Sequence, residues 1–154
     1  MTEEHHNLHD SLIERLPRTS KAKPALCLGA YRGIEVQVLR ELGWNAWGID
    51  IAPPVNSRFV VYGDFHDLQL PSSSFDLVYS NNAKHSTHPD KFIEEIRRVL
   101  SPHGQLILEV ELLCRDCWWN DIGLLETFIK TYNFDLVKSS CFDYPFRGQQ
   151  LIFN

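Results

Sequence analysis

A short apolar run that leads through a glycine-containing loop into an amphipathic helix constrains this chain more than any other feature. The run is Ala25 to Leu28, the loop is Gly29-Ala30-Tyr31-Arg32-Gly33, and the helix extends from about Gly33 to Leu42. Glycine lets a backbone turn sharply and lets a ligand approach closely, while the start of a helix offers free N–H groups and a positive dipole end. The unit is suited to a nucleotide-like cofactor, although the glycines alone are equally consistent with a tight turn between strand and helix.

Hydrophobic periodicity defines the faces of the helix in this unit. Its apolar side chains recur at i, i+4 and i+8 from Ile34, which predicts one buried face. Glu35 falls outside this stripe and is predicted to face solvent with the other charged residues. Gly43 then ends the helix, as glycine commonly does.

Strand-like and helix-like segments alternate through the rest of the chain. Helices are expected at 8–16, after Asn7 as a cap, from Pro89 to about 100, and around 124–132. Strands are expected at 45–51, 59–62, 75–80, 105–112, 134–139 and 149–153. This alternation predicts an α/β fold in which a mostly parallel sheet carries helices on both faces. Ligands of such sheets lie beyond the C-terminal strand ends, where the strand order reverses.

Length and composition indicate one globular domain. The 154 residues fit a single domain, with a helix and connector at 1–23 ahead of the main body at 24–154. A net charge of −5 gives no basic face for nucleic acid, and no segment has the ~20 apolar residues that a membrane helix needs. Because residues 1–10 also lack the apolar core of a signal peptide, we expect a cytoplasmic protein.

The cysteines are expected to be reduced in that compartment. Cys114 and Cys117 form a C-x-x-C pair, but no second pair is present to complete a zinc site. We therefore expect the cysteines to be structural or incidental, and we predict no metal site.

Acidic residues follow the next two predicted strands. Asp50 lies near the end of the second strand, where a carboxylate can accept hydrogen bonds from both hydroxyls of a ribose; a capping or loop-stabilising aspartate is also common there. Asp64 and Phe65 follow the third strand, where they could accept a hydrogen bond from an adenine amino group and cover a base face. A turn aspartate and a core phenylalanine would also explain this pair.

Four segments carry a family resemblance in their order and spacing. They are LCLGAYRGIE (26–35), WGIDI (47–51), GDFHDLQLPSSSFDLVYSNN (63–82) and FIEEIRRVLSPHGQLIL (92–108). Together they resemble class I S-adenosylmethionine-dependent methyltransferases of the methyltransferase type 11 kind. The resemblance implies a Rossmann-like, mostly parallel seven-stranded sheet, S-adenosylmethionine as cofactor, and methyl transfer to an unidentified acceptor that we expect to be a small molecule.

The resemblance also implies which residues contact the cofactor. The methionine part would lie by a first group, the ribose by a second, the adenine by a third, and the sulfonium and acceptor by a fourth. In that order, the groups are Gly29, Ala30, Tyr31 and Gly33; Asp50 and Ile51; Asp64 and Phe65; and Ser80, Asn81 and Asn82.

The first loop departs from the family at two positions. The family usually has an acidic residue at the position of Cys27, where it helps to order the loop and the cofactor's amino group, and a glycine at that of Tyr31. These departures favour an alternative, a non-catalytic relative that binds cofactor weakly or serves as an interaction module. A nicotinamide-dependent oxidoreductase is disfavoured because the chain has no G-x-G-x-x-G.

Ring-bearing side chains after the fourth and fifth strands are candidates for the acceptor side. His85 and His88 are candidate general bases for an oxygen or nitrogen acceptor, although both are more simply explained as surface loop residues. Trp118 and Trp119, in the segment 114–120, would wall the acceptor, pack the following helix or cover a dimer face. Because no inserted cap covers the site, we expect an acceptor pocket that is open, or that is completed by a second subunit of a homodimer or by a macromolecular substrate.

Overall fold

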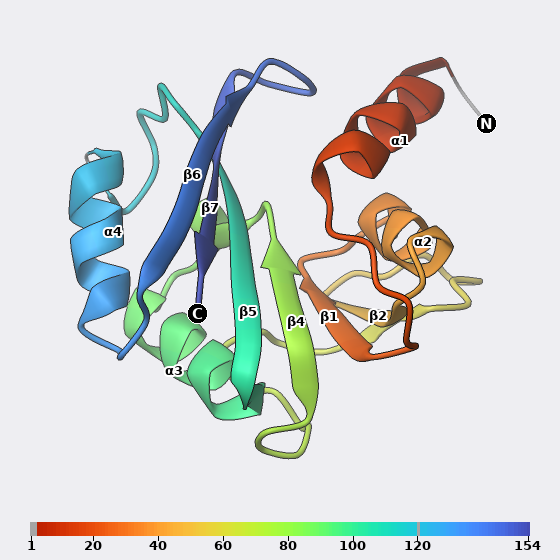
Figure 1. Cartoon of the computed structure of the whole chain (residues 1–154), viewed down its shortest axis with the longest axis horizontal. Helices are drawn as coiled ribbons and strands as arrows, with labels where there is room; N and C mark the ends of the chain where they lie inside the picture. Colours follow the sequence, from red (N-terminus) through yellow and green to blue (C-terminus); the bar gives the residue numbers. More distant parts are fainter. Residues whose placement is uncertain (1–2, 120) are drawn as a thin grey trace.

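The computed structural model describes residues 3–119 and 121–154, which form one sheet with helices on both faces (Figure 1). The seven strands are β1 (Pro24–Leu28), β2 (Asn45–Asp50), β3 (Val60–Tyr62), β4 (Phe75–Ser80), β5 (Leu100–Glu111), β6 (Leu136–Phe142) and β7 (Gly148–Phe153). The helices are α1 (Glu3–Arg15), α2 (Ile34–Glu41), α3 (Pro89–Val99) and α4 (Ile122–Lys130), with a 3-10 turn η1 at Ala83–His85. The predicted α/β fold is confirmed.

The strand order indicates where on the sheet a ligand is expected to bind. The order is β3-β2-β1-β4-β5-β7-β6. Strands β1 to β5 pair in parallel, whereas β7 runs antiparallel between β5 and β6. The chain builds outward from β1 to β3 and then restarts on the other side of β1 with β4. The order therefore reverses at β1, and the crevice beyond the carboxyl ends of β1 and its neighbours is the expected ligand position.

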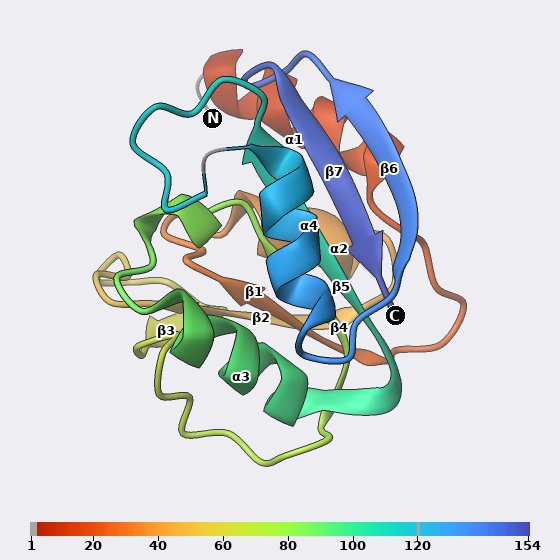
Figure 2. The same ribbon diagram turned by 90° about the vertical axis from the view of Figure 1, so that its left-hand side faces the viewer.

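Two apolar layers hold the helices against the sheet. In Figure 2, α3 and α4 lie in front of the sheet, and α1 and α2 lie behind it. The front layer joins Phe92 and Ile96 of α3 and Leu125 of α4 to the sheet, and the rear layer joins Leu12 of α1 and Leu39 of α2 to the opposite face. Since both faces are covered, the central strands are apolar on both sides, as the sequence shows for β1 and β4.

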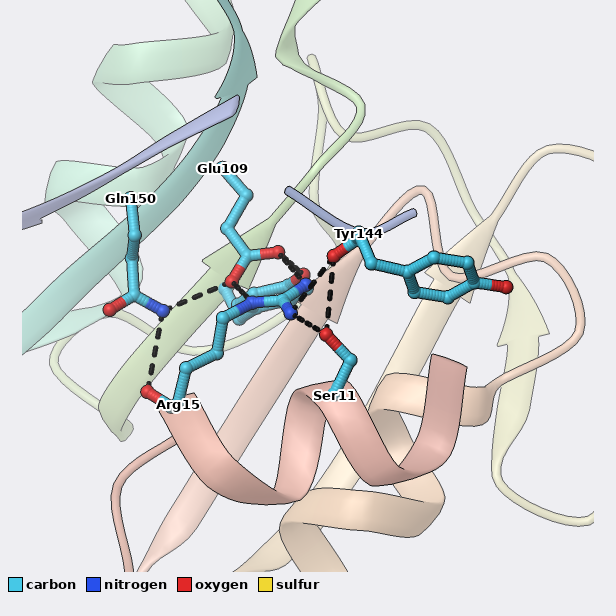
Figure 3. A network of polar contacts seen from close by, with 6 residues as sticks. Ser11, Arg15, Glu109, Tyr144 and Gln150 are labelled. Carbon is cyan, nitrogen blue, oxygen red and sulfur yellow. Dashed lines mark hydrogen bonds and ion pairs between the residues drawn. The ribbon is translucent and has the colours of Figure 1, made fainter. Parts of the chain in front are cut away.

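A buried polar network fixes α1 to the rear of the sheet (Figure 3). Glu109 of β5 is 2% exposed. It accepts hydrogen bonds from Arg15 Nε and Nη2 of α1 at 2.6 and 2.9 Å, from the Tyr79 hydroxyl at 2.8 Å and from Gln150 Nε2 at 3.0 Å. A bidentate arginine together with neutral donors satisfies both carboxylate oxygens, so α1 is tied to β4, β5 and β7 at one point.

Two predicted boundaries are wrong. Helix α1 begins at Glu3 rather than near residue 8, so Asn7 lies inside it and does not cap it; polar residues can continue a helix beyond its apolar stripe, and such ends are hard to place from sequence. Strand β5 begins at Leu100, so the segment 101–104 that was expected as a helix stop is extended. The pairing of β4 with β5 is irregular there, which lets an extended segment contain Pro102.

Glu35 does not face solvent as predicted. It is 7% exposed and belongs to the buried side of α2. Glu35 lies one turn before Leu39, which is buried in the rear layer, so both side chains project from the same side of the helix. Its charge led to the wrong assignment, because a helical stripe is defined by position and not by polarity.

Cys114 and Cys117 are joined by a disulfide, with their Cα atoms 5.6 Å apart. The expectation of reduced thiols is therefore wrong for this pair; the tight turn after β5 brings the two Cα atoms within the range that a disulfide spans. Cys27 is a buried free thiol, and Cys141 is an exposed one. Among the side chains that the structure describes, which exclude those of residues 1–2, 4–6 and 120, no cluster of three or more His, Cys, Asp or Glu is suited to a metal. No helix of the described residues is both long and apolar enough to cross a bilayer.

Candidate cofactor and acceptor site

One cavity lies at the carboxyl ends of β1, β2 and β4, where the strand order reverses. Its volume is about 360 Å³, within the range of small-ligand sites. The loops that follow these strands, and the loop after β3, supply its walls. Its lining residues are Gly29, Ile49, Asp50, Ile51, Gly63, Asp64, Phe65, His66, Asn82, His85 and Thr87.

The first loop is held tightly against the loop that follows β4. Gly29 has a φ of 71°, and a Cβ atom at this position would lie 2.7 Å from Asn82 Cβ, so only glycine fits. Asn82 Nδ2 donates to Gly29 O at 2.5 Å and to Asn81 Oδ1 at 2.9 Å. Because an amide has two N–H donors, Asn82 Nδ2 is fully used in bracing this loop.

Asp50 also supports the first loop. Its Oδ2 accepts a hydrogen bond from Tyr31 N at 2.9 Å, and its Oδ1 accepts one from Ala52 N at 2.8 Å. The carboxylate has about four acceptor positions, so two remain for a ligand in the cavity. The loop-stabilising and ligand-binding interpretations of Asp50 are thus compatible.

Asp64 begins a chain of polar contacts that crosses the cavity wall. Its Oδ1 accepts from His66 N at 2.8 Å and lies 2.8 Å from His66 Nδ1, while His66 Nε2 lies 2.8 Å from Ser86 Oγ. The backbone N–H of His66, with its ring, holds the pKa of Asp64 below its usual range. Phe65 lines the cavity and also packs edge-on against Phe92 in the front layer. Asp64 is therefore ionised, with Oδ2 directed to no described side chain.

A second hollow of about 540 Å³ adjoins the first loop on its other side. Gly29 and Asn82 line both spaces, so the two hollows share these residues as a common wall. Ala30, Tyr31 and Glu35 contribute to the second hollow alone. Burial, with the charges of Glu109 and Asp50, raises the pKa of Glu35 to about 7.

A third, more polar hollow begins at His85. It has a volume of about 380 Å³ and shares His85 with the main cavity. Lys84 and Glu111 form an ion pair in its wall. Arg115 also lines this hollow, so a ligand there would meet charged and polar groups.

The two tryptophans pack the helix that follows them. Trp118 Nε1 donates to Ala83 O at 2.7 Å, and its ring packs edge-on against Trp119 and Phe128 of α4. Trp119 is 6% exposed. Of the three alternatives, this arrangement matches packing against α4. The hydrogen bond to Ala83 also holds η1, which contains His85. Residue 120 of this segment lies outside the described residues.

Comparison with known proteins decides the family. A family model described as a methyltransferase domain matches residues 26–108, which run from β1 into β5 and include the loops after β1, β2, β3 and β4. The chain belongs to this methyltransferase family. The match confirms the resemblance seen in the four sequence segments.

A sequence relative supports the same family membership. The malonyl-[acyl-carrier protein] O-methyltransferase of Alcanivorax borkumensis is 30% identical over 117 residues, covering 66% of this chain and 39% of the relative. The chain thus matches about two fifths of the length of that curated relative.

Solved structures share the fold of this methyltransferase. The methyltransferase in a complex with the Haloferax volcanii Trm112 activator has a TM-score of 0.79 and 17% identity, with 97% of this chain and 88% of that chain covered. The 1,6-didemethyltoxoflavin-N1-methyltransferase of Burkholderia thailandensis, solved with its substrate and S-adenosylhomocysteine, has a TM-score of 0.76 and 15% identity, covering 98% of this chain and 77% of that one. At such identities the similarity concerns the fold.

The structure gathers most, but not all, of the residues predicted for the methyltransferase site. Seven of them line the main cavity: Gly29, Asp50, Ile51, Asp64, Phe65, Asn82 and His85. Ala30, Tyr31 and Asn81 line the second hollow. Ser80 is fully buried, and Gly33 lines a separate surface hollow by α2. His88 lines none of these spaces within the described structure; its ring stands edge-on to that of His66.

Sequence reasoning missed several residues that line the site, among them three with polar side chains. His66 and Thr87 line the main cavity, and Glu35 lines the second hollow. The signal for His66 was its place in the segment GDFHD beside Asp64. The signal for Glu35 was its helical spacing from Leu39. Thr87 carried no local signal, because its position depends on how η1 packs.

Proposed function

We propose that this chain transfers a methyl group from S-adenosylmethionine to a small polar acceptor. The observation that carries the proposal is the single cavity in which Gly29, Asp50 and Asp64 meet at the reversal point of the sheet. Both carboxylates retain acceptor capacity after their backbone contacts are counted. Family membership supports the same chemistry.

The residues present fit a nucleoside with an amino-acid part. Asp50 would accept hydrogen bonds from ribose hydroxyls, Asp64 would accept one from the adenine amino group, and Phe65 would lie along the base. The second hollow, around Ala30 and Asn81, would take the amino-acid part. When bound, S-adenosylmethionine supplies an electrophilic methyl group on a positively charged sulfur.

The buried and more distant candidates would act by positioning. Ser80 Oγ donates to Leu28 O at 3.0 Å and accepts from Asn82 N at 3.1 Å. Ser80 therefore joins β1 to the loop after β4 and would hold Asn82 in place. Gly33, with a φ of 74°, would set the start of α2 behind the loop.

The third hollow is the proposed acceptor site. His85 lies where this hollow meets the main cavity and would serve as general base for an oxygen or nitrogen acceptor. Lys84 and Arg115 would donate hydrogen bonds to a polar acceptor, while Glu111 and Asp116 balance their charge in the same hollow. Two similar proteins are named for methylation at such atoms. The malonyl-[acyl-carrier protein] O-methyltransferase is named for an oxygen acceptor, and the 1,6-didemethyltoxoflavin-N1-methyltransferase is named for a nitrogen acceptor.

A non-catalytic relative is the second candidate, favoured by Cys27 and by the exposed Tyr31 at the mouth of the second hollow. Calorimetric titration with S-adenosylmethionine, S-adenosylhomocysteine and NAD separates the candidates. We expect binding of the two adenosyl ligands and not of NAD. Absence of adenosyl-ligand binding would favour the second candidate, a non-catalytic relative that serves as an interaction module.

Activity is tested by transfer of isotope-labelled methyl groups to a panel of small carboxylic acids, phenols and amines. We expect His85→Ala to lower turnover by about 100-fold or more while leaving S-adenosylhomocysteine affinity unchanged. His88→Ala is the matched control and should change neither quantity. Equal losses of turnover in both variants would contradict the assignment of His85.

A further inference from the structure

The carboxyl group of Glu35 is buried, and no ion pair joins it to a described side chain. The residue is 7% exposed, and within residues 3–119 and 121–154 the hydrogen bond to its carboxyl comes from its own backbone N–H. It nevertheless lines the second hollow, next to Gly29 and Asn81. An unpaired buried carboxylate is unfavourable, so a Glu35 side chain at the wall of a ligand-sized hollow favours a ligand that brings positive charge.

Glu35 also lies beside the position of the missing family acid. Burial, and then the charge of Glu35, raises the pKa of the Cys27 thiol, so the carboxyl group of Glu35 acts electrostatically on this position of β1. Cys27 stands on β1 where methyltransferases of this kind usually have an acidic residue. The structure thus retains a carboxyl group in this part of the site, but on α2 instead of β1.

We propose that Glu35 replaces the missing strand acid and binds the α-ammonium group of the cofactor's amino-acid part. This inference rests on the proposed function. A carboxylate and an ammonium form strong charge-assisted hydrogen bonds when both are withdrawn from water. Glu35 would therefore distinguish nucleosides that carry an amino-acid part from those that do not.

Binding through Glu35 is coupled to protons. The titratable groups that act on Glu35 or are acted on by it are Cys27 of β1, Asp50 of β2, Tyr79 of β4 and Glu109 of β5. Arg15 is engaged with Glu109, and Arg32 lines the same hollow as Glu35. An ammonium ligand favours the ionised carboxyl, so binding below about pH 7 releases the proton that Glu35 holds.

The test compares S-adenosylhomocysteine, which carries the amino-acid part, with 5′-methylthioadenosine, which lacks it. By calorimetry at about pH 8, Glu35→Gln should weaken S-adenosylhomocysteine binding roughly 10- to 100-fold, the range for a lost hydrogen bond between charged groups. Binding of 5′-methylthioadenosine should stay unchanged. In buffers of different ionisation enthalpy, the original chain should release protons near pH 7 on binding S-adenosylhomocysteine, and Glu35→Gln should not.

Two further variants keep the outcome interpretable. Glu41→Gln makes the same change on the exposed side of α2 and should leave both affinities unchanged. Cys27→Asp, added to Glu35→Gln, returns an acid to β1 and should restore part of the preference for S-adenosylhomocysteine.

The results that overturn the inference differ from those that overturn the proposed function. If Glu35→Gln weakens both ligands equally, or neither, Glu35 does not bind the ammonium group. Asp50→Ala should weaken both ligands, because both contain the ribose. If the original chain binds neither ligand, the proposed function fails and the inference fails with it.

Discussion

Two buried glutamates on the rear side of the sheet have opposite surroundings. Glu109, under α1, accepts hydrogen bonds from Arg15, Tyr79 and Gln150. Glu35, at the start of α2, receives one from its own backbone N–H. Both residues are less than a tenth exposed. Burial is therefore not what separates them; the presence of partners is.

The difference separates a structural carboxylate from one available to a ligand. Every acceptor oxygen of Glu109 is engaged by a neighbouring element, and no cavity reaches it among those described. Glu35 lines a hollow, and its pKa is raised to about 7 because nothing nearby offsets its burial. A buried carboxylate that is paired with a cation and hydrogen-bonded on both oxygens fixes the position of an element, whereas a buried carboxylate without a paired cation costs stability that a cationic ligand can recover.

Removing the partner of Glu109 should have the largest effect. Arg15→Ala leaves this carboxylate buried without a cation, and we expect it to lower the free energy of unfolding by about 3–5 kcal/mol, measured by urea denaturation. Arg147→Ala is the control, because its contact with Asp143 at 3.7 Å joins two side chains that are 81% and 93% exposed. That variant should change stability by less than about 0.5 kcal/mol. Similar losses in both variants would contradict the central place of the Glu109 network.

Neutralising Glu35 should raise the free energy of unfolding, in contrast to the loss expected for Arg15→Ala. Its pKa is about 7 in the folded chain against an ordinary 4.5, so the folded state loses stability as the pH rises from 4.5 to 7. Glu35→Gln removes this loss and should stabilise the chain by roughly 2–3 kcal/mol at pH 8, with little change near pH 4. Urea denaturation at both pH values measures the difference. An equal gain at both would mean that the charge of Glu35 is not the cause.

Asp50 is an intermediate case, since it has two backbone donors and also lines the cavity. Asp50→Ala should weaken S-adenosylhomocysteine binding by about 1–3 kcal/mol, through the loss of charge-assisted hydrogen bonds. Asp50→Asn retains one carbonyl acceptor and should show a smaller loss in the same titration. Unchanged affinity in both variants would contradict the proposal that Asp50 binds the ribose.

Ser11, at the exposed edge of the Glu109 network, should have the smallest effect on stability. Ser11 Oγ accepts from Arg15 and donates to Tyr144 O at 3.2 Å near the surface. Ser11→Ala should cost about 1 kcal/mol or less in urea denaturation, because water can replace the hydroxyl there. A loss as large as that of Arg15→Ala would show that the network depends on its rim as much as on its buried centre.

Local sequence patterns predict the elements of this fold better than their pairing. The apolar runs of β1 and β4 and the stripe of α3 follow directly from their spacing. The insertion of β7 between β5 and β6 has no local pattern, because a strand's apolar face does not name its neighbour. The alternation of strands and helices predicted a mostly parallel sheet, and the family resemblance added that it has seven strands.

The same limit applies to the site. Asp50 and Asp64 were predicted because they follow strands, and strand ends meet at one edge of a parallel sheet. Glu35 was placed on the wrong face because its charge outweighed its helical spacing from Leu39, and the contact of His66 with Ser86 joins segments 20 positions apart. The Arg15–Glu109 pair, which joins residues 94 positions apart, is invisible to any local pattern for the same reason.

The position of β7 has a consequence for how the chain is made. Strands β5 and β6 leave the ribosome before β7, yet they pair with β7 and not with each other. Until residues 148–153 are available, the slot between them remains open and two strand edges stay unpaired, a state that favours aggregation. Gln150 also reaches Glu109 only then. The strands that carry the main cavity can therefore assemble first, and the sheet is completed by an insertion near its other edge.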